Sequence, residues 1–163
     1  MRLIKLAIIS AVVLFLVVLG ISSLIPSHVR ISRAVNMHAS QEASMGPVLK
    51  IEDWQGWNEL VKGISPAKIQ YRIQQLNTDS LSIKITHATA DTIKTVWKSQ
   101  SGREIAGVFT FQQSGEVTIV QWYFDFHQRW YPWEKFASIN FDKQWGPLME
   151  KSLDNLKNIV ERH

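Results

Sequence analysis

The sequence predicts an α+β fold in which an antiparallel β-sheet packs against a long C-terminal α-helix, after one N-terminal transmembrane helix. Three observations predict this fold. Residues 6–25 carry no charge and no proline, residues 69–127 alternate apolar and polar side chains in short runs, and residues 141–160 repeat apolar side chains at helical spacing. An amphipathic helix that follows a one-sided antiparallel sheet buries its apolar stripe against that sheet.

The composition is that of one domain and excludes several kinds of site. The chain has 163 residues and no cysteine, so disulfides, thiolate metal sites and cysteine nucleophiles are excluded. It has 18 Lys and Arg residues against 14 Asp and Glu residues, and Arg2 and Lys5 precede the apolar segment. This mildly basic balance argues against a nucleic-acid-binding protein, in which basic residues cluster on one face.

Residues 1–26 are interpreted as a transmembrane anchor. A helix over residues 6–25 is about 30 Å long, which matches the hydrocarbon core of a bilayer, and Pro26 ends it. The alternative is a cleaved signal peptide, because Arg2 and Lys5 form a short basic n-region. The apolar run is longer than the usual h-region of about 7–15 residues, and no clear A-x-A site precedes Pro26, so we favour the anchor.

Residues 27–163 are interpreted as one domain, and we expect it to lie outside the cytoplasm. The basic residues that flank the apolar segment are nearly balanced, with Arg2 and Lys5 before it and Arg30 and Arg33 after it. A short basic tail is typical of a cytoplasmic N-terminus. A domain without cysteine also loses nothing in an oxidising compartment.

A strand and short helices open the domain. The segment His28–Met37 alternates apolar and polar side chains, apart from Arg33 on the apolar face, and predicts a strand. Ser40 is a candidate N-cap for the first helix. We expect Gly46-Pro47 to break that helix, because proline lacks a backbone donor and clashes with the preceding turn.

Five further strands follow Pro66 and are joined by short turns. Connections this short cannot carry a parallel crossover, so the strands are expected to be antiparallel. With the first strand, six strands are predicted. The five are expected around residues 69–73, 81–85, 93–97, 105–111 and 117–127.

The C-terminal segment predicts one long amphipathic helix. Its apolar side chains recur at spacings of three, four and seven, with charged residues on the other side. Gly146-Pro147 is expected to kink or restart it. The apolar stripe consists of Phe141, Trp145, Leu148, Met149, Leu153, Leu156, Ile159 and Val160.

The order of these elements resembles the helix-grip fold of the SRPBCC superfamily, which includes START lipid-transfer domains and polyketide cyclases. The chain is most similar to the membrane-anchored bacterial branch, which implies a single-pass protein of the bacterial inner membrane. The resemblance covers nearly the whole chain. It rests on Asp53-Trp54, Gly56-Trp57-Asn58, the stretch TyrProTrpGluLysPhe at 131–136, and the C-terminal motif of Gly146-Pro147, Glu150, Leu153 and Asn155-Leu156-Lys157.

Two features depart from that family pattern. Gly46-Pro47 stands where relatives have a continuous first helix. The six predicted strands are one fewer than the fold usually has, and only residues 60–67 are left for the missing strand. We therefore expect a smaller or more open pocket.

The resemblance implies an apolar ligand cavity between the sheet and the C-terminal helix. Aromatic residues at period two are also typical of a plain core, so lining and packing both remain open. The candidate cavity residues are Trp97, Phe109, Val120, Trp122, Phe124, Phe126, Leu148, Met149 and Leu153.

Candidate catalytic groups are few. Asp125 and His127 share one strand face, where a carboxylate could orient the imidazole and raise its pKa. They have the parity opposite to Trp122, so they face solvent if Trp122 faces inward. His28, His38 and His87 are scattered along the chain and are not at metal-ligand spacing. We therefore predict no catalytic residue, no metal and no cofactor.

Four tryptophans allow two interpretations. Trp54, Trp57, Trp130 and Trp133 either form a rim in the interfacial region of the bilayer or pack the corners between helix and sheet.

The hypothesis for function is a membrane-tethered, non-enzymatic and monomeric module that binds a hydrophobic small molecule or lipid and no nucleic acid. One alternative is a cyclase-like or hydrolase-like enzyme that uses Tyr71, Tyr123 or His127 in the same cavity. The other is a scaffold whose exposed tryptophans bind a membrane protein partner, which a large exposed apolar patch would favour.

Overall fold

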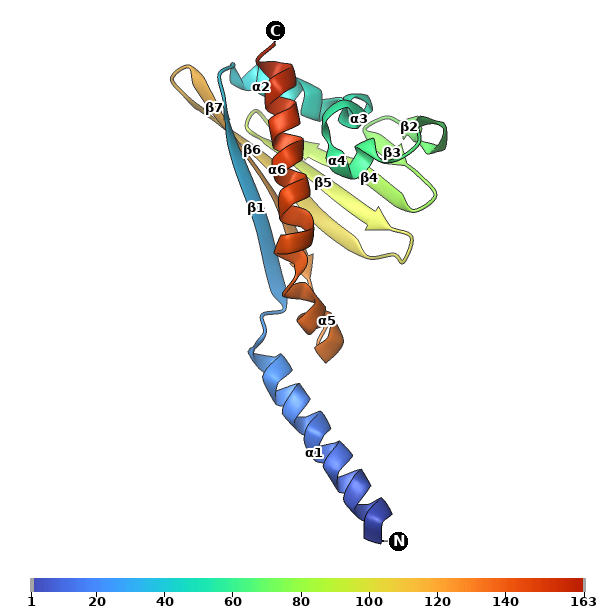
Figure 1. The fold of residues 1–163 in the computed structure, drawn as a ribbon. Helices are drawn as coiled ribbons and strands as arrows, with labels where there is room; N and C mark the ends of the chain where they lie inside the picture. Colours follow the sequence, from blue (N-terminus) through green and yellow to red (C-terminus); the bar gives the residue numbers. More distant parts are fainter. Residues whose placement is uncertain (1, 163) are drawn as a thin grey trace.

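A computed structural model describes residues 2–162 and shows a long N-terminal helix, a seven-stranded antiparallel sheet and a long C-terminal helix across one face of the sheet (Figure 1). The predicted α+β class is confirmed. The strands are β1 (His28–Met37), β2 (Gln70–Arg72), β3 (Gln75–Asn77), β4 (Leu81–Ala88), β5 (Thr92–Ser99), β6 (Glu104–Ser114) and β7 (Val117–His127). The helices are α1 (Arg2–Leu24), α2 (Gln41–Leu49), α3 (Trp54–Trp57), α4 (Glu59–Lys62), α5 (Pro132–Ser138) and α6 (Phe141–Val160).

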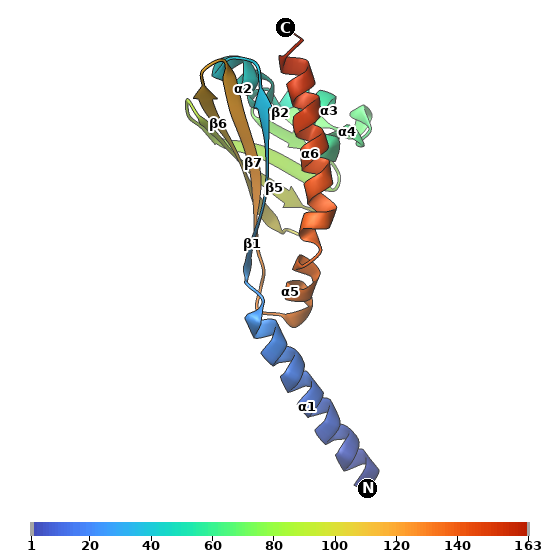
Figure 2. The ribbon, with the colours of Figure 1, turned by 60° about the vertical axis from the view of Figure 1, so that its left-hand side comes forward.

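The first strand pairs with the last one, so the spatial order is β1-β7-β6-β5-β4-β3-β2. All the pairs are antiparallel, and Figure 2 shows α6 beside the sheet with β1 and β7 at its edge. The register places Trp122 of β7 opposite Phe109 of β6. Both side chains are fully buried, so this parity of the strands faces α6, as the alternation predicted.

The predicted count of six strands is wrong, because residues 70–77 form a hairpin of two short strands, β2 and β3. The chain turns at Ile73 and Gln74, and Gln74 has a φ of 55°. The alternation of Ile69, Tyr71 and Ile73 continues into this turn, which contains none of the glycine, asparagine or proline residues that mark most tight turns. Residues 60–67 contain α4 and a 3-10 turn rather than the missing strand.

The prediction that Gly46-Pro47 breaks the first helix is also wrong. Ser40 caps α2 as expected, with its Oγ accepting from the backbone N–H of Ala43 at 3.2 Å. The helix then continues through Pro47 to Leu49. Two indoles hold its last turn, because Trp54 Nε1 donates to the carbonyl of Val48 at 2.9 Å and Trp57 Nε1 donates to that of Pro47 at 3.4 Å.

Gly146-Pro147 does not restart the C-terminal helix, and α6 runs unbroken from Phe141 to Val160. Arg33 of β1 holds the helix on both sides of the proline. Its Nη2 donates to Asp142 Oδ1 at 2.9 Å and its Nε donates to Glu150 Oε1 at 2.6 Å. A Cβ at position 146 would overlap the guanidinium group, so the glycine leaves the space that this clamp occupies.

The core between the sheet and α6 is predominantly aromatic. Trp122 stacks on Phe109 with ring centroids 4.8 Å apart, and Trp54 lies 5.3 Å from Trp57 and 5.8 Å from Trp97. Trp54 and Trp57 are fully buried. The interpretation that they belong to a membrane-facing rim is therefore wrong, because their rings fill the space between α2, β5 and β6.

The N-terminal helix α1 projects away from the domain (Figure 1). Among the described residues it is the one helix that is long and apolar enough to cross a membrane, and none of its most apolar window is buried. This confirms an N-terminal apolar helix that could serve as a membrane anchor or a signal sequence.

Candidate functional site

An apolar pocket of about 320 Å³ lies between the first turns of α6 and the end of the sheet where β5 and β6 are joined. Seven strand and loop residues line it together with two aromatic residues of α6. This wall consists of Leu81, Trp97, Ser99, Ser101, Arg103, Ile105, Phe126, Phe141 and Trp145.

The α6 side of the pocket is built from aromatic rings in tilted and edge-on contact. Phe141 lies 4.9 Å from Phe126, and Trp145 contacts Phe124 and Phe126 edge-on with centroids 5.4 Å apart in each case. Residues 141 and 145 are one helical turn apart, so both rings project from the same face of α6. Helical periodicity therefore places two aromatic walls over the end of β7.

The indole of Trp97 is held by hydrogen bonds on the sheet side. Its Nε1 donates to Thr95 Oγ1 at 3.1 Å, and the Thr95 hydroxyl donates to the carbonyl of Gly107 at 3.0 Å. The donor of the indole is therefore satisfied inside the core. What the ring presents to the pocket is apolar surface.

Polar side chains gather at the rim. Ser99 Oγ and Ser101 Oγ are 2.7 Å apart, and Arg103 Nη2 donates to Glu134 Oε1 at 3.1 Å. The other oxygen of Glu134 accepts from the backbone N–H of Arg129 at 3.0 Å. A polar recess adjoins the pocket at Ser101 and Arg103, so an amphiphile with its apolar part in the pocket would have charged groups beside its head.

The predicted cavity residues divide into three sets. Trp97 and Phe126 line the pocket. Leu148 is 39% exposed and does not line the pocket. The remaining six are buried in the part of the interior that side chains fill, between the sheet and the middle of α6. They are Phe109, Val120, Trp122, Phe124, Met149 and Leu153. That any of the nine contacts a ligand stays a prediction.

Most of the pocket wall was not identified from the sequence. Leu81 and Ile105 have the inward parity of their strands, and Phe141 and Trp145 belong to the apolar stripe of α6, so each was predicted to face the core. No pattern in the sequence distinguishes the end of the sheet that stays open from the part that is filled. The sequence did not identify Arg103 as a pocket residue, because Arg103 lies in the turn between β5 and β6.

Asp125 and His127 lie on the face of the sheet opposite α6. Arg30 donates to both oxygens of Asp125 at 2.7 and 2.8 Å, and His28 Nε2 lies 3.3 Å from the same carboxylate. The hydrogen bond from Arg30 holds the pKa of Asp125 below its ordinary value, although partial burial opposes this shift. His127 is exposed, as the strand parity predicted, and its ring lies 4.8 Å from that of His28.

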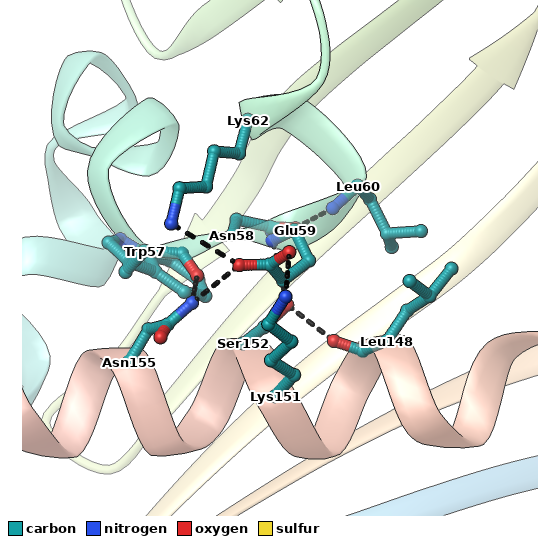
Figure 3. Close-up of polar contacts among 9 residues, drawn as sticks. All are labelled: Trp57, Asn58, Glu59, Leu60, Lys62, Leu148, Lys151, Ser152 and Asn155. Atoms are coloured by element: carbon teal, nitrogen blue, oxygen red, sulfur yellow. Dashed lines mark hydrogen bonds and ion pairs between the residues drawn. The ribbon is translucent and has the colours of Figure 1, made fainter.

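A second polar cluster fastens α3 and α4 onto α6 (Figure 3). The Glu59 carboxylate accepts from Asn155 Nδ2 at 2.7 Å and pairs with Lys151 Nζ at 3.0 Å and Lys62 Nζ at 3.4 Å. The hydrogen bond from Lys151 lowers the pKa of Glu59, burial opposes this, and the bond from Asn155 lowers it further. The backbone N–H of Glu59 also donates to Ser152 Oγ at 2.9 Å.

Because folding lowers the pKa values of Asp125 and Glu59, we expect the protein to lose stability in acid. Their contribution is fully present above the ordinary pKa values of 4.5 for Glu59 and 3.8 for Asp125, and it is lost as the pH falls through the lowered pKa values of the folded state. Urea unfolding of the full chain in detergent micelles at several pH values measures this loss. The double variant Glu59→Gln and Asp125→Asn should show a flatter pH dependence. An unchanged slope would mean that neither ion pair contributes.

Within residues 2–162 no three His, Cys, Asp or Glu side chains are grouped so that they could hold a metal ion.

A scan of protein-family models and a search of curated proteins find no match to this chain. Several solved structures share its fold. A START superfamily protein from Mycobacterium smegmatis is 21% identical with a TM-score of 0.54, over 82% of this chain and 97% of that one. CalU16 from Micromonospora echinospora is 10% identical with a TM-score of 0.57, over 80% and 65% of the two chains.

DynU16, a protein from the dynemicin biosynthetic locus, is 15% identical with a TM-score of 0.55. The match covers 81% of this chain and 47% of DynU16, so this chain spans about half the length of that relative. At these identities the likeness concerns the fold alone. The chain therefore shares with these proteins a helix-grip-like fold, in which an antiparallel sheet packs against a long C-terminal helix.

Proposed function

We propose that this chain is a membrane-anchored binding module that holds a hydrophobic small molecule or a lipid in the pocket beside α6. The observation that carries the proposal is the composition and place of that pocket. Aromatic and aliphatic side chains form most of its wall, with serine and arginine at the rim. Small-molecule sites commonly combine an apolar wall with a few polar groups, and about 320 Å³ is at the lower end of their usual range.

The position of the pocket supports a ligand that comes from a membrane. Figures 1 and 2 show α5 beside the end of α1, and α5 is joined to the pocket rim through the ion pair of Arg103 with Glu134. The pocket wall continues in Phe141, three residues after α5 ends. The pocket therefore lies at the α1 end of the domain.

An uncleaved anchor accounts for the length of α1. Its 23 residues correspond to roughly 35 Å of helix, enough to cross the hydrocarbon core. A signal peptide would need only a shorter apolar run. The intact mass of the protein from a membrane fraction should therefore include residues 1–26, and a chain that begins near residue 27 would remove the anchor from the proposal.

Filling the pocket is expected to abolish ligand binding. The variant Ile105→Trp places a large ring in the pocket, whereas Ala106→Trp places the same ring on the opposite, exposed face of β6. We expect a dansyl-labelled fatty acid to bind the full chain in detergent micelles, and Ile105→Trp to weaken binding about tenfold or more, or about 1.4 kcal/mol. Equal binding by both variants would exclude the pocket as the site.

Native mass spectrometry of the full chain tests the same proposal without a chosen ligand. A lipid or other apolar molecule that co-purifies should remain bound after the detergent is removed in the gas phase. It should be present with Ala106→Trp and absent with Ile105→Trp. An unliganded chain in all three samples, together with no binding of the labelled fatty acid, would contradict the proposal.

The domain is proposed to lie outside the cytoplasm of a bacterial cell, with α1 in the inner membrane. Reporter fusions after His163 should then be active only in the extracytoplasmic compartment. Because Arg30 and Arg33 nearly balance Arg2 and Lys5, a companion variant Arg2→Glu with Lys5→Glu should weaken this orientation. A wild-type fusion active only in the cytosol would reverse the proposed topology.

The arrangement of polar groups favours binding over catalysis. Tyr71 belongs to β2 at one edge of the sheet, whereas Tyr123 and His127 belong to β7 near the other edge. Tyr123 lies under the guanidinium group of Arg30, 4.2 Å from ring centroid to Cζ, on the face opposite α6. The enzyme hypothesis requires such groups to meet in the pocket. These three candidate catalytic groups do not meet there.

A further inference from the structure

The segment around α5 carries a patch of four exposed apolar side chains and one half-buried tyrosine, here called the α5 patch. It comprises Trp130, Tyr131, Trp133, Phe136 and Ile139. Trp130 is 68% exposed, Trp133 64% and Ile139 62%. Tyr131 stacks on Trp133 with ring centroids 4.8 Å apart and lies 4.7 Å from Trp130. These aromatic side chains are thus ordered against one another while their outer surfaces remain uncovered.

A buried lysine attaches α5 to the last turn of α1. Lys135 Nζ donates to the backbone carbonyl of Ser22 at 3.2 Å, and the two residues are only 8% and 2% exposed. The Ser22 carbonyl also accepts from the backbone N–H of Ile25 at 3.2 Å. The carbonyl groups in the last turn of a helix carry partial negative charge, so an ammonium group there is stabilising. Figures 1 and 2 both show α5 against this end of α1.

This contact sets the depth of the α5 patch. In a spanning helix that ends at Leu24, the last turn lies where the chain leaves the hydrocarbon core. The bond from Lys135 to Ser22 therefore holds α5 at the level of the lipid headgroups. Tryptophan and tyrosine are enriched at this level, because their rings are apolar and their N–H and O–H groups remain hydrated.

We infer that the α5 patch is a second membrane-binding surface, which inserts its side chains into the headgroup boundary of the bilayer that α1 spans. The inference rests on the proposed anchor. It also narrows the ligand class, because Glu134 of α5 binds Arg103 at the pocket rim. The patch then holds the pocket rim at the bilayer surface, and the ligand is an amphiphile resident in the membrane rather than a solute.

Single labelled cysteines test the depth directly, since the chain has no cysteine of its own. The fluorophore NBD is attached to Trp133→Cys or Ile139→Cys in the patch, and to Val12→Cys within α1. The control is Ile73→Cys, 94% exposed in the β2–β3 turn away from α1. Each full chain is reconstituted into phosphatidylcholine–phosphatidylglycerol vesicles with lipids that carry a doxyl quencher at a shallow or a deep acyl position.

The patch probes are expected to shift to shorter emission wavelengths and to be quenched more by shallow than by deep doxyl groups. The Val12 probe should be quenched more by deep ones, and the Ile73 probe by neither. If the patch probes behave like the Ile73 probe while Val12 is quenched, the inference is overturned, the anchor stands, and the patch is left as a surface for a protein partner. Quenching of the patch probes without quenching at Val12 supports the patch and removes the anchor. No quenching at either place overturns both.

The unsubstituted protein provides a second measurement that does not depend on labelling. Trp54, Trp57, Trp97 and Trp122 are buried in the domain, whereas Trp130 and Trp133 are exposed. Lipids brominated near the headgroup should therefore quench a minor fraction of the tryptophan emission in vesicles. That fraction should disappear in the double variant Trp130→Ser with Trp133→Ser. A wild-type emission that brominated lipid leaves unchanged would contradict the inference.

Discussion

Replacing Leu153 by alanine is expected to lower the free energy of unfolding by about 2–5 kcal/mol, the range found for buried leucines. Leu153 is 1% exposed and lies on the face of α6 that packs against the sheet, one turn before the fully buried Leu156. Shortening the side chain leaves a cavity among large aromatic rings that cannot easily move to fill it. Urea unfolding of the full chain in detergent micelles, followed by far-UV circular dichroism, measures the change.

His127→Ala is the matched control, because it removes a side chain of β7 from the face opposite α6. His127 is exposed and contacts the ring of His28, so the free energy of unfolding should change by no more than about 0.5 kcal/mol. The pair of variants tests which parity of β7 faces α6. If His127→Ala lowered the free energy of unfolding by about 2 kcal/mol or more while Leu153→Ala were tolerated, the strand would face the other way, and Asp125 and His127 would point toward α6 as the enzyme hypothesis needs.

Replacing Gly107 by alanine is expected to cost about 1–3 kcal/mol, the usual cost of overpacking a core. A Cβ at this position would lie 2.6 Å from Thr95 Oγ1 and 2.9 Å from Cε1 of Phe124. The Thr95 hydroxyl cannot move freely, because it donates to the carbonyl of Gly107 and accepts from Trp97. Alanine also restricts the unfolded chain, which stabilises by about 0.4–1 kcal/mol, and the steric term is expected to exceed that gain.

The neighbouring residue provides the control for Gly107→Ala. Ala106 is exposed on the opposite face of β6, so Ala106→Val should change the free energy of unfolding by no more than about 0.5 kcal/mol. Thermal unfolding of both variants beside the wild type measures the difference. Equal stability of Gly107→Ala and Ala106→Val would mean that Thr95 and Phe124 move aside at little cost in free energy. The core around Trp97 would then be less tightly packed than the contacts indicate.

Side-chain periodicity alone predicted most of the fold. The alternation along residues 117–127 places Trp122 and His127 on opposite faces, and in the structure one is buried and the other exposed. The predicted strand His28–Met37 coincides with β1, and the predicted helix over residues 141–160 coincides with α6. These inferences hold because a half-buried strand or helix must repeat its apolar residues at the period of its own backbone.

Two prolines show where a local rule was overridden by contacts that are distant in sequence. Pro47 and Pro147 both lie inside continuous helices. The helix around Pro47 is held by the indoles of Trp54 and Trp57, and the helix around Pro147 by Arg33 from the first strand. A proline removes one helical hydrogen bond. The tertiary hydrogen bonds compensate for this loss and keep each helix continuous.

The sequence by itself determined that this chain has an apolar N-terminal helix and a sheet whose inward parity faces a C-terminal helix, because those properties depend on periods that a single segment contains. Only the tertiary structure decided which part of that inward surface is open. Trp54 and Trp57 fill the middle of the interior, whereas Phe141 and Trp145 leave about 320 Å³ at the α1 end. Whether space remains between two layers depends on side chains from several elements at once, and no local period records how their volumes add.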